Sequence, residues 1–148
     1  MNEWRAAGPD DADALTDLER DANLVALAHV FPPDRFPFPW DGVHDRWAAT
    51  LAEPGVVVEV VDGDGRLDAF VAHDGVTLRH LGVHPERWGQ GLAREAVQRA
   101  SAAGATRLWC LVDNLRARGL YDHLGYHETG SSRQAPWPPY PTEVELTR

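Results

Sequence analysis

The sequence contains no lysine, and all 14 of its basic residues are arginine. We attribute this bias to GC-rich codon usage, but it excludes modification of the protein on lysines of its own. Positive charge is also scarce, because 23 acidic residues give a net charge of −9 and an isoelectric point near 5.1. A protein that follows the phosphates of a nucleic acid needs a basic face, so we expect no nucleic-acid partner. The acidity either keeps the protein soluble or attracts a cationic amine.

Cysteine and long apolar runs are equally scarce. Cys110 is the only cysteine, so no internal disulfide can form. No apolar run approaches the roughly 20 residues that cross a bilayer, and residues 1–5 lack the basic start and apolar stretch of a secretory signal. We therefore expect a soluble, cytoplasmic protein without a membrane partner. A chain of 148 residues has the size of one domain, and we assign residues 1–148 to a single domain.

Apolar periodicity and turns that contain glycine or proline divide the chain into alternating strands and helices. Asp-Gly turns at 62–65 and 74–75 connect three consecutive strands, which predicts an antiparallel meander. The expected strands are 2–7, 56–61, 67–73, 76–83, 108–112, 126–131 and 142–147, and the expected helices are 11–28, 44–51, 90–103 and 117–124. We therefore predict an α+β fold, with a mixed, mostly antiparallel sheet of about seven strands and about four helices on its two faces.

The segment 81–93 runs from a strand directly into a helix through a turn that contains Gly89 and Gly91. The first N–H groups of a helix have no internal partner and lie at the positive end of its dipole, so they suit a phosphate or pyrophosphate. The two glycines let an anion approach the backbone, and Arg87 offers a charge-assisted contact. The three glycines of a Rossmann fingerprint and the Gly-Lys-Ser/Thr sequence of a P-loop are both missing, which excludes these two nucleotide-binding motifs.

Two motifs resemble the Gcn5-related N-acetyltransferase (GNAT) family. In that family a strand ends in Leu-x-Val-x-Pro and leads into x-Gly-x-Gly-x-Gly/Ala. Here Leu81-Gly82-Val83-His84-Pro85 is followed by Trp88-Gly89-Gln90-Gly91-Leu92-Ala93. The second family motif, a strand, an asparagine, a helix with Ala and Tyr and then Leu-Gly-Phe/Tyr, resembles residues 111–126, which contain Asn114, Ala117, Tyr121 and Leu124-Gly125-Tyr126. Many members have Gln or Arg in place of Trp88, and a tryptophan there is similar to the branch that acetylates ribosomal proteins.

The resemblance implies an acyltransferase that uses acetyl-CoA and needs no metal. It implies a splay between the fourth and fifth strands, which admits the pantetheine arm of the donor. Tyr121 would protonate the leaving thiolate, unless it is only a core tyrosine, and Asn114 would lie near a pantetheine amide or cap its helix. The donor-binding residues expected on this basis are Leu81, Gly82, Val83, Arg87, Trp88, Gly89, Gln90, Gly91, Leu92, Ala93, Asn114 and Ala117.

The sequence offers several groups that would take the proton from an amine acceptor: Glu59, His73, His80 and Glu143, with relay through water as the alternative. We name Glu59 as the catalytic base, because it is a lone carboxylate among valines; otherwise it lies on the solvated face of the sheet. In this fold two loops flank the acceptor, and their aromatic residues form either a binding wall or a packed lid. We assign acceptor binding to Phe31, Phe36, Trp40 and Trp137.

The sequence therefore predicts an N-acetyltransferase that moves an acetyl or other short acyl group from coenzyme A to a primary amine of a small molecule. A protein N-terminus or a ribosomal protein is the alternative acceptor. An alternative of another class is a non-catalytic acyl-CoA sensor or partner module, which would keep residues 87–93 but would not need Tyr121 or Asn114. We expect a monomer or a homodimer.

Overall fold

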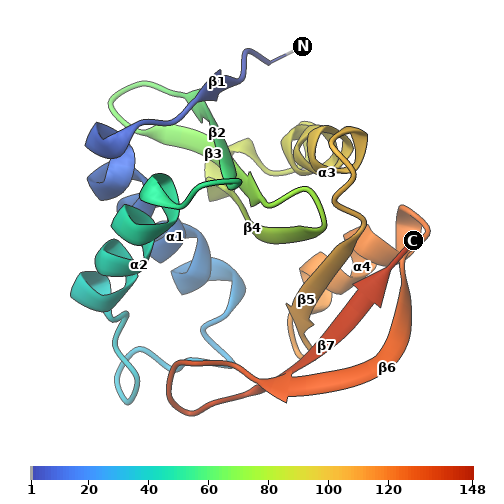
Figure 1. Ribbon diagram of the computed structural model, residues 1–148. Helices are drawn as coiled ribbons and strands as arrows, with labels where there is room; N and C mark the ends of the chain where they lie inside the picture. Colours follow the sequence, from blue (N-terminus) through green and yellow to red (C-terminus); the bar gives the residue numbers. More distant parts are fainter. Residues whose placement is uncertain (1) are drawn as a thin grey trace.

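A computed structural model describes residues 2–148 and shows one seven-stranded sheet with helices on both faces (Figure 1). The strands lie in the order β1-β2-β3-β4-β5-β7-β6. Their bounds are Arg5–Ala6 (β1), Val57–Asp62 (β2), Leu67–His73 (β3), Thr77–Val83 (β4), Arg107–Leu111 (β5), His127–Gln134 (β6) and Thr142–Thr147 (β7). The helices are Ala12–Ala26 (α1), Trp40–Ala52 (α2), Leu92–Ala102 (α3) and Leu115–His123 (α4), with short 3-10 helices at Pro9–Asp11 and Pro85–Arg87. The predicted α+β fold is confirmed.

Strands β2, β3 and β4 form the predicted antiparallel meander. Val57 pairs with His73 in the first hairpin, and Ala69 pairs with Val83 in the second. Every residue of β3 is buried, because this strand has a neighbour on each side and helices on both faces. The meander is therefore the supporting half of the sheet, on which α1, α2 and α3 pack.

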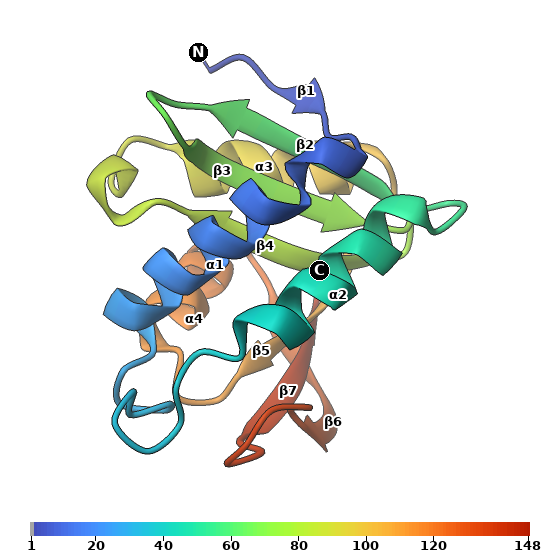
Figure 2. The ribbon, with the colours of Figure 1, turned by 90° about the vertical axis from the view of Figure 1, so that its left-hand side faces the viewer.

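Helices α1 and α2 cover one face of the meander, and α3 covers the other (Figure 2). On the first face, Leu15 and Trp47 pack in one cluster with Val60 and Phe70. On the second face, residues of α3 and α4 pack with β3, β4 and β5; the cluster includes Ala96, Val97, Ala100, Tyr121, Val71, Leu78 and Leu108. The apolar stripes that predicted the helices thus form a core on each side of the sheet.

The sheet is nearly divided at its centre, where β4 and β5 run parallel. Thr77 pairs with Arg107 and Leu78 pairs with Leu108, and then the two strands diverge. Beyond Leu78, β4 continues beside β3 alone, while β5 continues beside β7. The predicted splay between the fourth and fifth strands is therefore confirmed.

Several element boundaries differ from the expectation, and strand β1 is shorter than expected because it begins at Arg5 rather than at residue 2. Helix α2 begins at Trp40 rather than at 44, because Pro39 occupies the residue before the helix, where its missing N–H costs nothing. Strand β6 extends to Gln134 rather than to 131, because it continues past a bulge between Glu128 and Ser132 and pairs again with β7. No helix among residues 2–148 is both long enough and apolar enough to span a membrane.

Candidate active site

A cavity of about 700 Å³ lies where β4 and β5 separate. Its walls come from these two strands, from α1, from α4 and from the turn that leads into α3. The residues expected from the sequence that line it are Leu81, Gly82, Val83, Arg87, Trp88, Gly89, Gly91, Leu92, Ala93, Asn114, Ala117 and Tyr121. The splay thus brings both sequence motifs together around one space, whose volume is typical of ligand sites. We call this space the junction cavity.

The turn between β4 and α3 presents open backbone to the junction cavity. Gly89 and Gly91 have φ angles of 77° and 86°, which residues with a side chain rarely adopt. Both glycines are exposed, and a Cβ atom at either would meet no atom within 4 Å. Helix α3 begins at Leu92, so the unpaired N–H groups of its first turn lie directly after these glycines. This end of the cavity therefore suits an anion.

Arg87 holds this turn in place through its own contacts with the protein. Its guanidinium donates to the Asp68 carboxylate, to Asn2 Oδ1 at 2.8 Å and to Gln90 Oε1 at 2.7 Å. Asp68 is only 5% exposed, so its charge is almost fully removed from water. Gln90 does not line the junction cavity, although the sequence placed it among the donor-binding residues. We therefore assign Arg87 and Gln90 to the shape of the turn.

Three arginines that the sequence analysis did not single out line the junction cavity: Arg79, Arg94 and Arg116. The Arg116 guanidinium carbon lies 3.8 Å from the centre of the Trp88 ring, in a cation–π contact. Trp88 Nε1 also donates to the Val83 carbonyl at 2.9 Å, so the ring is held at both ends. Arg116 lies inside the second sequence motif, but only the fold shows that the start of α4 faces the glycine turn.

Tyr121 lies in the wall of the junction cavity and is 6% exposed. Its ring packs edge-to-face against Tyr126, with 5.4 Å between the ring centroids. Burial, together with the neighbouring Cys110 and Tyr126, raises the pKa of the Tyr121 phenol well above its usual value. Burial also raises the pKa of the Cys110 thiol to about 11. Both groups are therefore protonated at neutral pH, and Tyr121 is a hydrogen-bond donor.

Asn114 begins α4 as a helix cap. Its Oδ1 accepts a hydrogen bond from the N–H of Ala117 at 3.2 Å. Both residues also line the junction cavity. The capping role that the sequence allowed is thus present, and the NH2 group of the same side chain is a donor suited to a ligand carbonyl.

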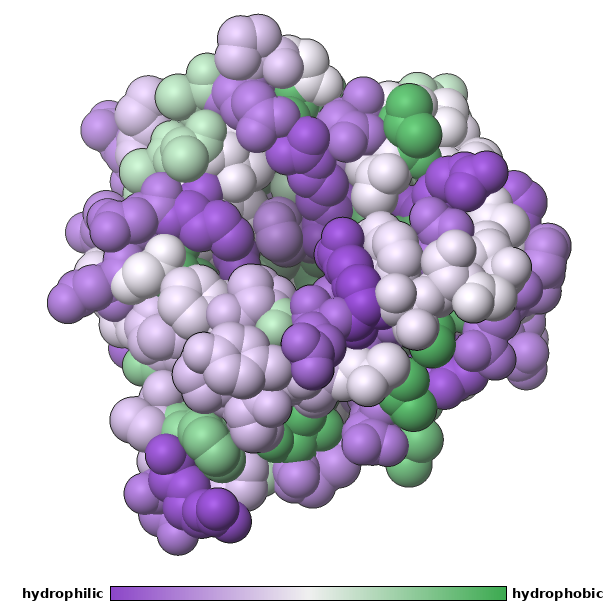
Figure 3. All heavy atoms as spheres, turned by 60° about the horizontal axis from the view of Figure 1, so that its bottom comes forward, coloured by the Kyte–Doolittle hydropathy of each residue, from purple (hydrophilic) through white to green (hydrophobic). Residues whose placement is uncertain are grey.

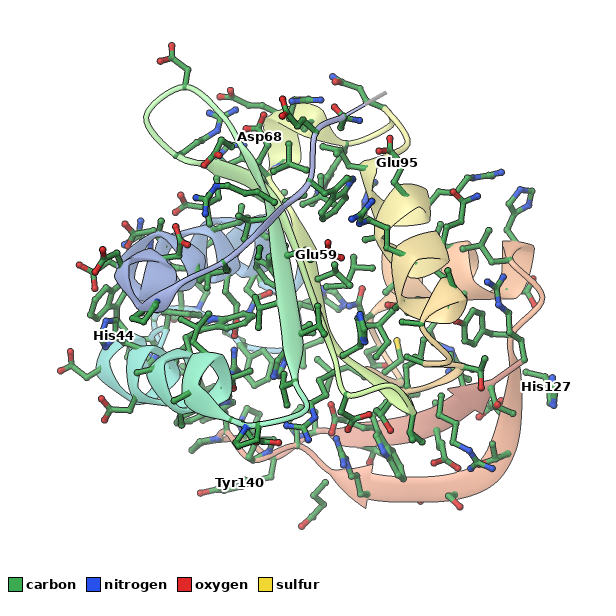
Figure 4. The ribbon with its side chains drawn as sticks, turned by 45° about the horizontal axis from the view of Figure 1, so that its top comes forward. His44, Glu59, Asp68, Glu95, His127 and Tyr140 are labelled. Carbon is green, nitrogen blue, oxygen red and sulfur yellow. The ribbon has the colours of Figure 1, made fainter. Side chains whose placement is uncertain are left out.

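Glu59 lies outside the junction cavity. Its carboxylate forms an ion pair with Arg99, with 2.6 Å between Oε2 and the nearest guanidinium nitrogen, and it lies between β2 and α3 (Figure 4). Side chains alternate along a strand, and Glu59 points to the same face as α3. The structure therefore does not bring Glu59 together with Tyr121, and the ion pair explains why a carboxylate interrupts a run of valines.

The other proton acceptors considered from the sequence occupy different places. His73 is buried at the end of β3 and does not line the junction cavity, whereas His80 and Glu143 do. The Glu143 carboxylate accepts a hydrogen bond from Arg133 at 2.9 Å. Within residues 2–148, no three His, Cys, Asp or Glu side chains are placed to hold a metal ion.

His80 is expected to make the fold sensitive to acid. Burial, together with the positive charges of Arg46, Arg79 and Arg133, lowers its pKa from 6.5 to about 3. Between these two pH values the unfolded chain binds a proton that the folded protein does not bind. The free energy of unfolding should therefore fall as the pH falls, by roughly 1 kcal/mol per pH unit from this residue. Urea denaturation at several pH values between about 4 and about 6.5 measures the slope.

The matched variant is His80→Asn. Its free energy of unfolding should depend less steeply on pH than that of the original protein, by roughly 1 kcal/mol per pH unit. His123→Asn replaces an exposed histidine and should leave the slope of the original protein almost unchanged. If His80→Asn and the original protein have the same slope, the pKa of His80 is not lowered in the folded state.

A second cavity, of about 330 Å³, lies between α1, the loop that follows it and the loop between β6 and β7. Three of the aromatic residues named for acceptor binding line it: Phe31, Phe36 and Trp137. Trp40 lines neither cavity, because it belongs to the first turn of α2 and its Nε1 donates to Asp17 Oδ1 at 2.9 Å. We call this second space the aromatic cavity.

Glu19 and Asn23 of α1 line both cavities, so the two spaces adjoin at this helix. The Glu19 carboxylate accepts hydrogen bonds from Arg46 and, at 3.0 Å, from Trp47 Nε1. The sequence analysis missed this pair, because polar residues on an amphipathic helix are normally solvated. Their spacing of four residues places them on one helix face, but only the fold shows that this face borders the cavities.

Comparison with known proteins agrees with this geometry. Residues 12–126 match the model of the acetyltransferase (GNAT) family, and no curated protein sequence matches the chain. A GCN5-related N-acetyltransferase structure from Rhodopseudomonas palustris is 18% identical, with a TM-score of 0.77 over 100% of this chain and 95% of that one. PaiA N-acetyltransferase from Thermoplasma acidophilum, solved in complex with coenzyme A, is 15% identical, with a TM-score of 0.65 over 100% of this chain and 99% of that one.

The ribosomal-protein-S18-alanine N-acetyltransferase of Escherichia coli is 21% identical, with a TM-score of 0.66 over 99% of this chain and 92% of that one. At these identities the solved structures show a shared fold. The family model, in contrast, matches most of the sequence and includes the glycine turn, Asn114 and Tyr121. From this match and from the divided sheet, we conclude that the chain belongs to the GNAT family of acetyltransferases.

Proposed function

We propose that this acyltransferase moves an acetyl group from acetyl-CoA to the primary amine of a small molecule. The observation that carries the proposal is that one cavity is lined by the unpaired part of β4, by the glycine turn before α3 and by Tyr121. Proteins of the GNAT family use acetyl-CoA as the donor. Each of the three parts of this cavity suits one part of that donor.

The glycine turn suits the pyrophosphate, because its backbone is open and the start of α3 supplies unpaired N–H groups. Arg94 and Arg116 add positive charge to the same wall. The backbone of β4 from Leu81 to Val83 suits the amides of the pantetheine arm, because an extended ligand pairs with a strand that lacks a neighbour. The thioester would then lie deep in the junction cavity, near Tyr121.

In the transfer, the amine nitrogen attacks the thioester carbon, so that a C–N bond forms and the C–S bond breaks. The departing sulfur takes a proton from the Tyr121 hydroxyl, which is protonated at physiological pH. A backbone N–H near Leu81 polarises the carbonyl. Much of the rate enhancement comes from holding the two reactants together in one space.

The amine must also lose a proton. We assign the acceptance of this proton to Glu143, directly or through water, because its carboxylate lines the junction cavity. Glu59 lies outside that cavity. His80 lines the cavity, but a group with a pKa of about 3 is a weak base at neutral pH.

Acetyl-CoA should stabilise the folded protein, and thiol should be released when a primary amine is added. A ligand at about 100 times its Kd adds about 2.7 kcal/mol to the free energy of unfolding. A thermal-shift assay measures the first effect, and a thiol-reactive dye measures the second. ATP is the control ligand, because it carries phosphates without the pantetheine arm and should stabilise the protein much less.

The outcomes separate the proposed functions. Stabilisation with amine-dependent thiol release supports the enzyme. Stabilisation without release on any amine or peptide supports the acyl-CoA sensor, and release on a peptide N-terminus alone supports a protein acetyltransferase. If acetyl-CoA does not stabilise the protein, the donor assignment fails.

A further inference from the structure

The aromatic cavity indicates the kind of amine that the protein acetylates, an inference that rests on the proposed function. Most of its lining consists of aromatic residues and prolines: Phe31, Phe36, Phe38, Trp137, Pro33, Pro37, Pro39 and Pro138. Its polar lining residues, within the part of the chain that the structure describes, are Glu19, Asn23 and Arg35. The transfer of an apolar group from water into such a space lowers the free energy.

The wall of this cavity is held in place before any ligand binds. Prolines fix their own φ angles, and the rings of Phe38 and Trp137 also pack against the core beneath α2. The Trp137 ring lies so close to Gly42 that a Cβ atom there would be 2.7 Å from the ring. A preformed wall binds its ligand without paying for the ordering of side chains.

The size of the aromatic cavity limits its occupant. An apolar cavity of about 150 Å³ takes up benzene, so about 330 Å³ holds one or two fused rings with a short linker. On the face drawn in Figure 3, the side chains of highest hydropathy form small separate groups. The volume of the aromatic cavity favours a small aromatic molecule as the occupant.

The border between the two cavities is polar. Glu19 and Asn23 line both, so the polar end of a molecule whose ring fills the aromatic cavity lies beside them. Arg46 already pairs with the Glu19 carboxylate and compensates its charge. Asn23 offers both a donor and an acceptor, which suits an uncharged amine, and the uncharged amine is the form that attacks a thioester.

We infer that the acceptor is an arylalkylamine, a primary amine joined by a short linker to an aromatic ring. The ring occupies the aromatic cavity against Phe31, Phe36 and Trp137, and the nitrogen lies beside Glu19 and Asn23. The nitrogen then faces the junction cavity, where the donor thioester is bound.

The assignment of an arylalkylamine acceptor is tested by measuring steady-state thiol release from acetyl-CoA with two amines. One is 2-phenylethylamine, and the other is ethylamine, which has the same aminoethyl group without the ring. The value of kcat/KM should be higher for 2-phenylethylamine by roughly tenfold or more, mostly through KM, because the ring leaves water. Phe36→Ala and Trp137→Ala should remove most of this preference, because they raise the KM for 2-phenylethylamine toward that for ethylamine. Trp40→Ala is the matched control, because Trp40 is an aromatic residue nearby that lines neither cavity.

Several results would overturn the inference while leaving acetyl transfer intact. Equal kcat/KM for the two amines, or turnover only with a peptide, excludes an arylalkylamine acceptor. A preference for hexanoyl-CoA that is lost in Phe36→Ala shows that the cavity holds the acyl chain instead. If acetyl-CoA does not bind at all, the proposed function fails and the inference fails with it.

Discussion

Tyr121→Phe is expected to lower kcat by about 100-fold and to change the KM for acetyl-CoA little, because general acids contribute roughly this much. The substitution removes only the hydroxyl from a side chain that lines the junction cavity. Without that hydroxyl the sulfur receives no proton from the protein and must leave as a thiolate anion. The phenol is protonated across the neutral pH range, so this donor is available wherever activity is measured. Steady-state kinetics with acetyl-CoA and an accepted amine measures the loss.

Tyr126→Phe is the matched control. Tyr126 packs against Tyr121, and its hydroxyl is buried without a hydrogen-bond partner among the described residues, but it does not line the junction cavity. Its removal should leave kcat within about twofold of the original protein. A kcat for Tyr121→Phe within about threefold of the original would show that Tyr121 is only a core residue, and equal losses in the two variants would assign the effect to packing.

Asp68→Ala is expected to lower the free energy of unfolding by about 2 kcal/mol, because Arg87 and Arg66, whose side chains are 26% and 35% exposed, lose the buried carboxylate that accepts their hydrogen bonds. Asp68 is buried at the start of β3, at the same end of the sheet as the glycine turn, and accepts hydrogen bonds from Arg87 and, at 3.3 Å, from Arg66 (Figure 4). Gly63 leaves room for this carboxylate, since a Cβ atom there would overlap it. Urea denaturation measures the change.

The same substitution should also weaken the binding of acetyl-CoA, because Arg87 then no longer holds the glycine turn. Asp64→Ala is the control, since Asp64 belongs to the same hairpin but is exposed, and it should change the free energy of unfolding by less than about 0.5 kcal/mol. If Asp68→Ala is as stable as Asp64→Ala, the buried pair does not support the turn.

Most of the fold was predictable because local patterns determine it. The Asp-Gly turns defined the hairpins of the meander, and the expected third strand, 67–73, coincides with β3. The start of α2 was not predictable, because the prolines before Trp40 suggested a longer loop. A proline just before a helix and a proline in a loop have the same sequence signal, and the packing of α2 on the sheet decides between them.

The site was predictable where it depends on the backbone and less so where it depends on distant side chains. The glycine turn and Tyr121 were found from motifs that are continuous in sequence. The partners of Glu59 and Arg87 were not, because Arg99 and Asp68 are 40 and 19 residues away in the chain. Charged side chains are satisfied by whichever partner the fold brings near, and periodicity carries no information about that partner.

Beyond Leu78, β4 has the properties of an edge strand although it lies in the middle of a sheet, because β5 has already diverged. An edge strand binds an extended molecule through main-chain N–H and C=O groups, which nearly every amino acid supplies. Recognition of this kind depends on the spacing of amides in the ligand and not on the identity of the strand's side chains. Mutation is then free to change most side chains along β4, provided that the strand and the packing of Phe70 against Gly82 survive. Such freedom explains how this architecture persists among proteins whose sequences have diverged widely.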